Sequence, residues 1–247
     1  MRVLITGATS GIGETFLEKF ISRGDEVIAV GRNLKKLNEL KVKYQVETLA
    51  IDLAKEENIY KLYENAKDID ILINNAGFGN FGYFSETDLT KDLEMISVNI
   101  KALHMLTKLY LSDFIKKNHG YILNVGSIGG FIPGPLMATY YATKAYVVSL
   151  TESIAIELKK MKASVYIGAL CPGPIQTHFF ENANASFVKK GASKEEIVNY
   201  AIKMMFKGKN IIIPKFSIKC SYLANKILPE SIVGNMVYKI QNRRSQS

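Results

Sequence analysis

Short apolar runs rich in β-branched residues alternate along the chain with longer segments in which apolar residues recur every three or four positions. A short apolar run between turn-forming residues is typical of a buried strand, whereas the wider spacing is typical of a helix with one buried face. On this basis we expect seven strands, at residues 3–6, 27–30, 48–51, 69–73, 121–125, 164–170 and 211–213.

The segments between these strands predict helices that cover the sheet. Ile12, Phe16, Phe20 and Ile21 fall on one helix face after the first strand, and Leu34, Leu37 and Leu40 do the same after the second. Continuously apolar strands separated by helices predict a parallel sheet with helices on both faces, an α/β fold of the doubly wound type. Such sheets bind ligands beyond the carboxyl ends of their strands.

The composition is compatible with one large domain. The chain has 247 residues, 47% of them hydrophobic, and no repeat or linker divides it, so we expect a single domain over residues 1–247. The two cysteines, Cys171 and Cys220, and the three histidines lack metal-ligand spacing, so no metal site is predicted. Few cysteines, and no recognisable secretory signal or long apolar run, favour a cytoplasmic protein.

The formal net charge of +9 is compatible with nucleic acid or an anionic membrane as a partner. The lysines are spread along the chain, however, and only residues 241–244 are locally basic. We therefore expect a solvated basic surface and no nucleic-acid partner. The same charge suits a phosphate-rich cofactor or an acidic substrate.

A glycine-rich segment directly follows the first predicted strand. Residues 6–13 read Thr-Gly-Ala-Thr-Ser-Gly-Ile-Gly and lead into a predicted helix. Glycines permit a tight turn and a close approach of the backbone to a pyrophosphate, and a helix N-terminus adds N–H donors. An ordinary turn is the alternative, but the placement favours a dinucleotide site. Its predicted contacts are Gly7, Thr9, Ser10, Gly11, Ile12 and Gly13.

The end of the second predicted strand indicates which dinucleotide is bound. NAD-binding domains usually carry Asp or Glu there, which accepts a hydrogen bond from the ribose 2′-hydroxyl. Here the strand is followed by Gly31-Arg32-Asn33, with no carboxylate. The guanidinium of Arg32 suits a 2′-phosphate, so NADP(H) is predicted in preference to NAD(H). The alternative is that Arg32 only begins the next helix.

A candidate catalytic group of three residues lies in the second half of the chain. Ser127 follows the fifth predicted strand, and Tyr140 and Lys144 are four residues apart in a helix expected over 139–158, on one face. We expect the ammonium to lower the pKa of the tyrosine, which then exchanges a proton with a substrate oxygen. Ser127 would donate a hydrogen bond to that oxygen. A chance pair is the alternative, and Tyr141 could be mistaken for the working tyrosine.

Together these segments resemble the short-chain dehydrogenases/reductases over nearly the whole chain. The matching motifs lie at residues 6–13 (T-G-x-x-x-G-x-G), 74–77 (N-N-A-G), 140–144 (Y-x-x-x-K) and 172–177 (P-G-x-I-x-T). Ser127 stands at the family's usual distance before the tyrosine. The resemblance implies a Rossmann-type fold with a seven-stranded parallel sheet, and an oxidoreductase that forms homodimers or homotetramers.

The resemblance also implies roles for individual residues. Tyr140 would be the proton donor, and Ser127 would orient the substrate carbonyl. Lys144 would also bind the nicotinamide ribose, and Asn99 would complete a catalytic tetrad by supporting a water-linked proton relay. The position of Arg32 again favours NADP(H). The other implied cofactor contacts are Asp52, Leu53, Asn75, Ala76, Gly77, Pro172, Gly173, Ile175 and Thr177.

Substrate specificity is expected in a loop at about 175–195. Its phenylalanines could cover an apolar substrate, and further apolar residues could line the opposite wall. Core packing is the alternative for both sets. The residues concerned are Phe179, Phe180 and Phe187 in the loop, and Phe131, Ile132, Leu136 and Met137 on the wall.

The segment at about 215–247 mixes apolar and basic residues. Packing on its own domain or at a subunit interface is favoured over contact with an anionic membrane.

The predicted function is NADPH-dependent hydride transfer to a ketone or aldehyde, on an apolar or acyl-chain substrate, with Tyr140 as general acid. One alternative is an NAD-dependent alcohol dehydrogenase of the same family. The other is a dinucleotide-binding sensor without turnover, which would have no need of Tyr140, Lys144 and Ser127 together. The motifs do not distinguish among 3-oxoacyl thioesters, steroids and long-chain ketones as substrates.

Overall fold

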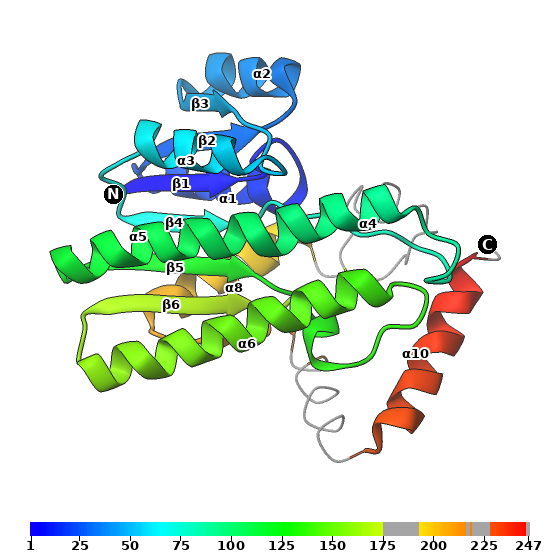
Figure 1. Cartoon of the computed structure of the whole chain (residues 1–247). Helices are drawn as coiled ribbons and strands as arrows, with labels where there is room; N and C mark the ends of the chain where they lie inside the picture. Colours follow the sequence, from blue (N-terminus) through cyan, green and yellow to red (C-terminus); the bar gives the residue numbers. More distant parts are fainter. Residues whose placement is uncertain (175–192, 216–217, 219–227, 246–247) are drawn as a thin grey trace.

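A parallel sheet of order β3-β2-β1-β4-β5-β6-β7 forms the centre of the protein (Figure 1). The computed structural model describes residues 1–174, 193–215, 218 and 228–245. All six strand pairings in these residues are parallel. The strands are β1 (Arg2–Thr6), β2 (Glu26–Gly31), β3 (Glu47–Ala50), β4 (Ile71–Asn74), β5 (Gly120–Val125), β6 (Val165–Leu170) and β7 (Ile211–Ile212).

Helices cover both faces of this sheet. Side chains of α1, α2 and α8 pack on one face, and those of α3, α5 and α6 pack on the other. The α-helices are α1 (Gly11–Ser22), α2 (Leu34–Tyr44), α3 (Glu56–Asn65), α4 (Leu89–Ile96), α5 (Leu103–Lys117), α6 (Ala138–Met161), α8 (Lys194–Phe206) and α10 (Glu230–Ser245). A π-helical turn, η1 (Ser97–Ala102), joins α4 to α5, and a 3₁₀ turn, η2 (Ile128–Phe131), follows β5.

The fold class predicted from the apolar pattern is confirmed. Every predicted strand overlaps an observed one, and the predicted helix 139–158 corresponds to α6. The largest shift at a strand start is at β4, which begins at Ile71 rather than at 69. The preceding Asp70 accepts a hydrogen bond from the backbone N–H of Arg2 through its side chain, 2.8 Å away.

Polar side chains define where several helices begin. Asn33 Oδ1 accepts from the backbone N–H of Lys36 at the start of α2, and Asp88 caps α4 in the same way. Ser193 and Glu196 form a capping box at the start of α8. Such caps satisfy N–H groups that have no partner within the helix.

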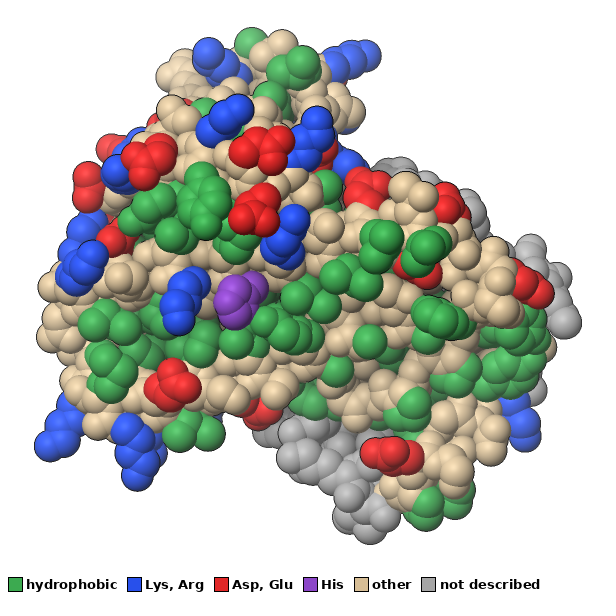
Figure 2. Space-filling model, viewed as in Figure 1, with side chains coloured by type: hydrophobic (Ala, Val, Ile, Leu, Met, Phe, Trp, Pro, Cys, Tyr) green, Lys and Arg blue, Asp and Glu red, His purple; other side chains and the backbone are tan. Residues whose placement is uncertain are grey.

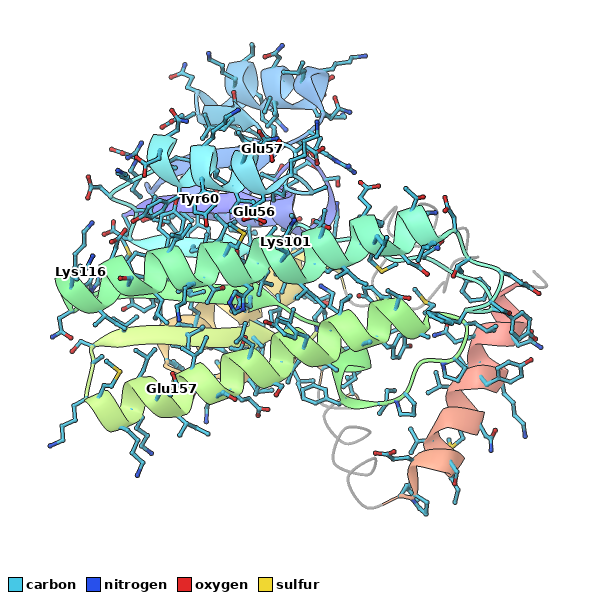
Figure 3. All side chains as sticks on the ribbon, in the orientation of Figure 1. Glu56, Glu57, Tyr60, Lys101, Lys116 and Glu157 are labelled. Carbon is cyan, nitrogen blue, oxygen red and sulfur yellow. The ribbon has the colours of Figure 1, made fainter. Side chains whose placement is uncertain are left out.

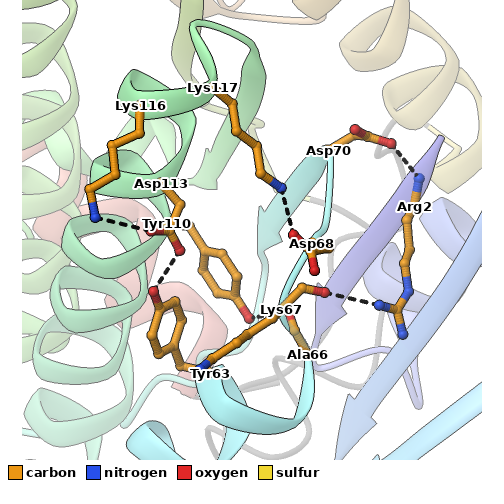
Figure 4. Close-up of polar contacts among 10 residues, drawn as sticks. All are labelled: Arg2, Tyr63, Ala66, Lys67, Asp68, Asp70, Tyr110, Asp113, Lys116 and Lys117. Carbon is orange, nitrogen blue, oxygen red and sulfur yellow. Dashed lines mark hydrogen bonds and ion pairs between the residues drawn. The ribbon is translucent and has the colours of Figure 1, made fainter.

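A polar network closes the end of the sheet that lies opposite the carboxyl ends of the strands (Figure 4). Tyr63 of α3 donates to Asp113 of α5 at 2.5 Å, and Tyr110 donates to the carbonyl of Ala66 at 2.9 Å. The hydrogen bond to Asp113 raises the pKa of Tyr63 to about 12. These bonds hold α3 against α5.

Charged side chains of both signs are mixed over the surface formed by α3, α5 and α6 (Figure 2). Lys101, for example, lies 3.8 Å from Glu56 across the boundary between η1 and α3 (Figure 3). Exposed pairs of this kind contribute little stability. On this face the basic residues form no single large patch, in agreement with the dispersed lysines of the sequence.

The helix α10 packs on the rest of the chain near the carboxyl ends of the strands (Figure 1). Val233 is 5% exposed, and the hydroxyls of Tyr238 and Tyr83 lie 2.8 Å apart. The part of the C-terminal segment that the structure describes therefore packs on its own domain, which is one of the two placements that the sequence favoured; the other, a subunit interface, stays a prediction. Within the described ranges, no helix has the length and apolar character needed to cross a membrane.

Candidate active site

A cleft of about 550 Å³ opens beyond the carboxyl ends of the strands, where the doubly wound fold predicts a ligand site. Most of the residues singled out in the sequence line it. Gly13 and Asn99 are not among the lining residues. Ile175 and Thr177 lie outside the described residues, and so does the part of the predicted substrate loop at 175–192. The predicted residues on the lining are Gly7, Thr9, Ser10, Gly11, Ile12, Arg32, Asp52, Leu53, Asn75, Ala76, Gly77, Ser127, Tyr140, Lys144, Pro172 and Gly173.

The glycine-rich turn forms one end of this cleft. Gly7 has φ +65°, a conformation that favours glycine, and α1 begins at Gly11 without a side-chain cap from Ser10. A Cβ on Gly13 would overlap the carbonyl oxygen of Gly7 and lie 2.5 Å from Asn75 Nδ2. At Gly7 and Gly13 the turn thus has no room for a side chain against itself and the residues after β4, and the first N–H groups of α1 start at the cleft. This arrangement fits a dinucleotide pyrophosphate.

Asn75 fixes this turn from the neighbouring strand. Its Nδ2 donates to the carbonyls of Thr6 and Gly7 at 3.0 and 3.1 Å. In return, Thr6 Oγ1 accepts from the backbone N–H groups of Asn75 and Ala76, both at 3.0 Å. The motif at 74–77 therefore holds the glycine-rich turn in place.

Two carboxylates lie beside Arg32, which follows β2 on the lining of the cleft. Arg32 Nη1 lies 2.7 Å from Glu94 Oε1 and 4.0 Å from Asp52 Oδ1, although the guanidinium side chain remains 59% exposed. The sequence has no carboxylate in the residues that directly follow β2, and the two carboxylates beside Arg32 come from other parts of the chain. Glu94 belongs to α4, 62 residues further along, so only the tertiary fold brings it there.

The three candidate catalytic residues converge on the cleft from β5 and α6. Ser127 follows β5, and its Oγ accepts from the backbone N–H of Gly129 at 3.0 Å. Tyr140 and Lys144 lie one turn apart on α6, with Lys144 Nζ 5.7 Å from the centre of the Tyr140 ring. Lys144 Nζ donates to the carbonyl of Val125 at 2.8 Å, which holds the ammonium between α6 and β5.

Burial dominates the titration of this group. Tyr140 is partly exposed to the cleft, yet the enclosing protein raises the pKa of its hydroxyl above the ordinary 10.0, while a hydrogen bond with Ser127 acts in the opposite direction. Burial also lowers the pKa of Lys144 from 10.5 to about 8. The prediction that the pKa of Tyr140 falls is therefore wrong for the protein without a bound dinucleotide. Desolvation exceeds the effect of an ammonium that lies over the ring rather than against the hydroxyl.

The buried lysine should make stability depend on pH. Between about pH 8 and pH 10, the unfolded chain keeps a proton that folded Lys144 has released, so stability rises with pH in this window. The contribution is at most about 1.4 kcal/mol per pH unit. We therefore expect wild type to gain stability relative to Lys144→Met as the pH rises from 8 to 10, measured by urea unfolding. A difference between the two proteins that does not change with pH would contradict this.

Asn99 lies behind the cleft in the π-helical turn η1. Its Nδ2 donates to the carbonyl of Phe78 at 2.9 Å and to Thr143 Oγ1 at 3.1 Å. Its Oδ1 accepts from the backbone N–H of Phe78 at 3.1 Å. The side chain thus links the loop after β4 to α6, close to Lys144. Its predicted role in a proton relay stays a prediction.

The predicted apolar wall is only partly on the cleft. Met137 lines it, whereas Phe131, Ile132 and Leu136 do not. Leu136 is 7% exposed and buried in the protein, and Phe131 packs against a small core cluster containing Val148 and Cys171. Core packing is the better interpretation for Leu136 and Phe131, and Ile132 is half-buried outside the cleft. Phe179, Phe180 and Phe187 fall outside the described residues.

Tyr141 and Gln241 are among the lining residues that were not predicted as functional. Tyr141 appeared in the sequence only as a residue that could be confused with Tyr140, and Gln241 was not singled out. Gln241 Nε2 donates to Tyr141 Oη at 2.9 Å. No local spacing could have revealed this pair, because the two residues are 100 positions apart. Among the residues the structure describes, no group of His, Cys, Asp and Glu side chains could hold a metal ion.

A glycine-rich turn at a helix N-terminus and a Ser–Tyr–Lys group on the same cleft form the arrangement of a dinucleotide-dependent oxidoreductase. A sequence model of the family described as short chain dehydrogenase matches residues 1–187. The chain belongs to the short-chain dehydrogenase/reductase family, whose members act on carbonyl or alcohol groups with NAD(P).

Individual relatives agree with this assignment. The chain is 30% identical to estradiol 17-beta-dehydrogenase 11 of Macaca fascicularis, over 96% of its own length and 82% of that protein. It is 39% identical to a very-long-chain 3-oxoacyl-CoA reductase of Vanderwaltozyma polyspora, over 66% of this chain but only 52% of that reductase. A solved short-chain dehydrogenase from Sphingobium yanoikuyae, in complex with NADPH, superposes with a TM-score of 0.83 at 30% identity, covering 90% of this chain and 91% of that one.

Proposed function

We propose that this protein uses NADPH to reduce a ketone or aldehyde, with Tyr140 as the general acid. The observation that carries the proposal is the meeting of Ser127, Tyr140 and Lys144 with the glycine-rich turn in one cleft. A protein that only binds a dinucleotide needs the turn but not these three side chains. The test is NADPH oxidation with a panel of carbonyl compounds, and turnover with none of them would leave the sensor as the better alternative.

Each residue has a distinct task in this reaction. The reduced nicotinamide, when bound, supplies the hydride. Ser127 donates a hydrogen bond to the substrate oxygen as negative charge develops there. Tyr140 transfers its hydroxyl proton to that oxygen, and Lys144 stabilises the phenolate that remains. Asn99 positions the loop after β4 and α6 relative to each other.

The proposed substrate is apolar or carries an acyl chain. Met137 and Ile128 supply apolar surface near Ser127 and Tyr140 in the cleft. Two relatives, an estradiol dehydrogenase and a very-long-chain 3-oxoacyl-CoA reductase, are named for substrates of this kind. We therefore expect apolar ketones and 3-oxoacyl compounds to be reduced faster than small polar sugars.

Arg32 is the proposed partner of the NADPH 2′-phosphate, with support from the NADPH complex of the Sphingobium relative. Arg32→Ala should weaken NADPH binding roughly tenfold, because the variant loses a charge-assisted hydrogen bond to the 2′-phosphate. It should leave NADH binding nearly unchanged, because NADH has no 2′-phosphate.

Glu94→Gln should tighten NADPH binding several-fold, because Glu94 both repels the phosphate and engages Arg32. The quenching or enhancement of dinucleotide fluorescence on titration gives both dissociation constants.

The matched control is Glu39→Gln. Glu39 forms a comparable exposed ion pair with Lys36 at 3.0 Å on α2, outside the cleft, so this variant should leave NADPH affinity unaltered. Equal effects of Arg32→Ala on NADPH and NADH would remove Arg32 as the selecting residue.

The NAD-dependent alternative is favoured by one observation. Glu94 and Asp52 place two carboxylates beside Arg32, and carboxylates accept hydrogen bonds from a ribose 2′-hydroxyl. If wild type binds NADH more tightly than NADPH, these carboxylates select the cofactor and Arg32 serves as their counter-ion. The same titrations decide between the two cofactors.

A further inference from the structure

The helix α10 contributes a buried amide to the cleft. Gln241 is 2% exposed and lies on the cleft lining, on the inward face that also carries Val233. An apolar residue such as Val233 is sufficient to pack a helix, whereas a buried amide is unfavourable unless it is hydrogen-bonded. The amide of Gln241 meets this condition by donating to Tyr141 Oη at 2.9 Å.

Tyr141 is held in a fixed orientation by the loop before α6. A Cβ on Gly129 would lie 3.1 Å from Tyr141 Cε1, and a Cβ on Gly134 would overlap the Tyr141 ring. The backbone at both glycines therefore packs directly against the ring, and any larger residue would displace it. A hydroxyl held this way, with a buried amide donating to it, is a preorganised polar group.

This polar group lies beside the reacting residues but is distinct from them. The rings of Tyr140 and Tyr141 have centroids 5.9 Å apart and an interplanar angle of 78°. Both tyrosines and Gln241 line the same cleft. The Gln241–Tyr141 pair and Tyr140 are thus neighbouring polar groups on one cleft, the arrangement that a substrate with two oxygens close together would use.

We propose that Gln241 and Tyr141 form a subsite for a second substrate oxygen, so that the preferred substrates are 3-oxo esters, 3-oxo thioesters and related compounds with two oxygens in 1,3-relation. The proposal rests on the proposed function, because it takes Tyr140 as the partner of the first oxygen. The nitrogen of Gln241 carries two N–H groups: one donates to Tyr141, and the other donates to the second oxygen. This contact holds the reacting carbonyl against Tyr140 and Ser127.

The test compares two ligands of equal chain length, an ethyl 3-oxoalkanoate and the dialkyl ketone that lacks the ester group. Calorimetric titration onto the full chain saturated with oxidised dinucleotide measures binding without any reduction. Wild type should bind the ester about tenfold more tightly, the size of one buried hydrogen bond. Gln241→Leu should remove most of this preference while changing ketone affinity less than twofold, and Tyr141→Phe should reduce it in the same direction.

Tyr238→Phe is the matched control for the position of α10. It removes a different hydrogen bond of this helix, between Tyr238 and Tyr83 at 2.8 Å, at a residue that does not line the cleft. The control should keep the preference for the ester. If Tyr238→Phe abolishes it as Gln241→Leu does, Gln241 only anchors the helix and the subsite is wrong.

Two further results would overturn the subsite. In the first, wild type binds the ester no more tightly than the ketone, or binds neither ligand. In the second, Gln241→Leu still binds the ester more tightly than the ketone. Failure of the proposed function is recognised separately, by NADPH-dependent turnover that persists in Tyr140→Phe, because the binding comparison involves no proton transfer from Tyr140.

Discussion

Tyr140→Phe is expected to lower kcat for carbonyl reduction by about 10²–10⁴-fold, the usual contribution of a positioned general acid. The substitution removes one hydroxyl and keeps the ring, which packs edge-on against Tyr141. The raised pKa of Tyr140 keeps the hydroxyl protonated at neutral pH, which is the state that an acid catalyst requires. The measurement is NADPH oxidation under saturating substrate.

Binding and stability are the controls for this variant. The glycine-rich turn and Arg32 lie away from the hydroxyl, so the dissociation constant for NADPH should change less than about threefold, and the melting temperature should stay near that of wild type. Because Lys144 is hydrogen-bonded to Val125 rather than dependent on Tyr140, its position should be preserved. Turnover retained at the wild-type rate would show that another group protonates the substrate.

Gly13→Ala is expected to disrupt dinucleotide binding and destabilise the fold together. The added Cβ would overlap the Gly7 carbonyl oxygen and lie 2.5 Å from Asn75 Nδ2, so the turn has to move. Moving it also breaks the hydrogen bonds from Asn75 to Thr6 and Gly7. Overpacking of this kind costs about 1–3 kcal/mol, which lowers the melting temperature by several degrees in a chain of this size. We expect NADPH affinity to fall at least tenfold.

Gly234→Ala is the matched control for a glycine in a helix. Among the described residues its Cβ would meet only Pro133 Cγ at 3.5 Å, an ordinary contact, and alanine favours a helix by about 1 kcal/mol over glycine. This variant should keep its dinucleotide affinity, with a melting temperature equal to or above that of wild type. If Gly13→Ala behaves in the same way, the turn has room that the structure does not show.

The fold was predictable because its signals are local and repeated. Each strand is a short apolar run, and each helix buries one face, so the alternation along the chain was sufficient to predict a parallel sheet covered on both faces. The observed order of strands confirms that class. The apolar residues between Ser127 and Tyr140 were harder to interpret, because periodicity does not show that, of the two buried residues Leu136 and Met137, only Met137 borders the cleft.

The sequence alone determined those parts of the candidate site that lie within one turn of backbone. The glycine spacing at 6–13 and the Tyr140–Lys144 spacing are set by a single turn and a single helix, whose geometry is known in advance. Parallel strands then bring these local units to the same edge of the sheet.

Only the tertiary structure decided what depends on distant residues or on burial. Glu94 reaches Arg32, and Gln241 reaches Tyr141, through chain folding that no local spacing encodes. The pKa of Tyr140 rises instead of falling, because desolvation depends on everything packed around the hydroxyl. Short-range geometry is therefore present in the sequence, whereas charge environment and long-range contacts exist only once the chain has folded.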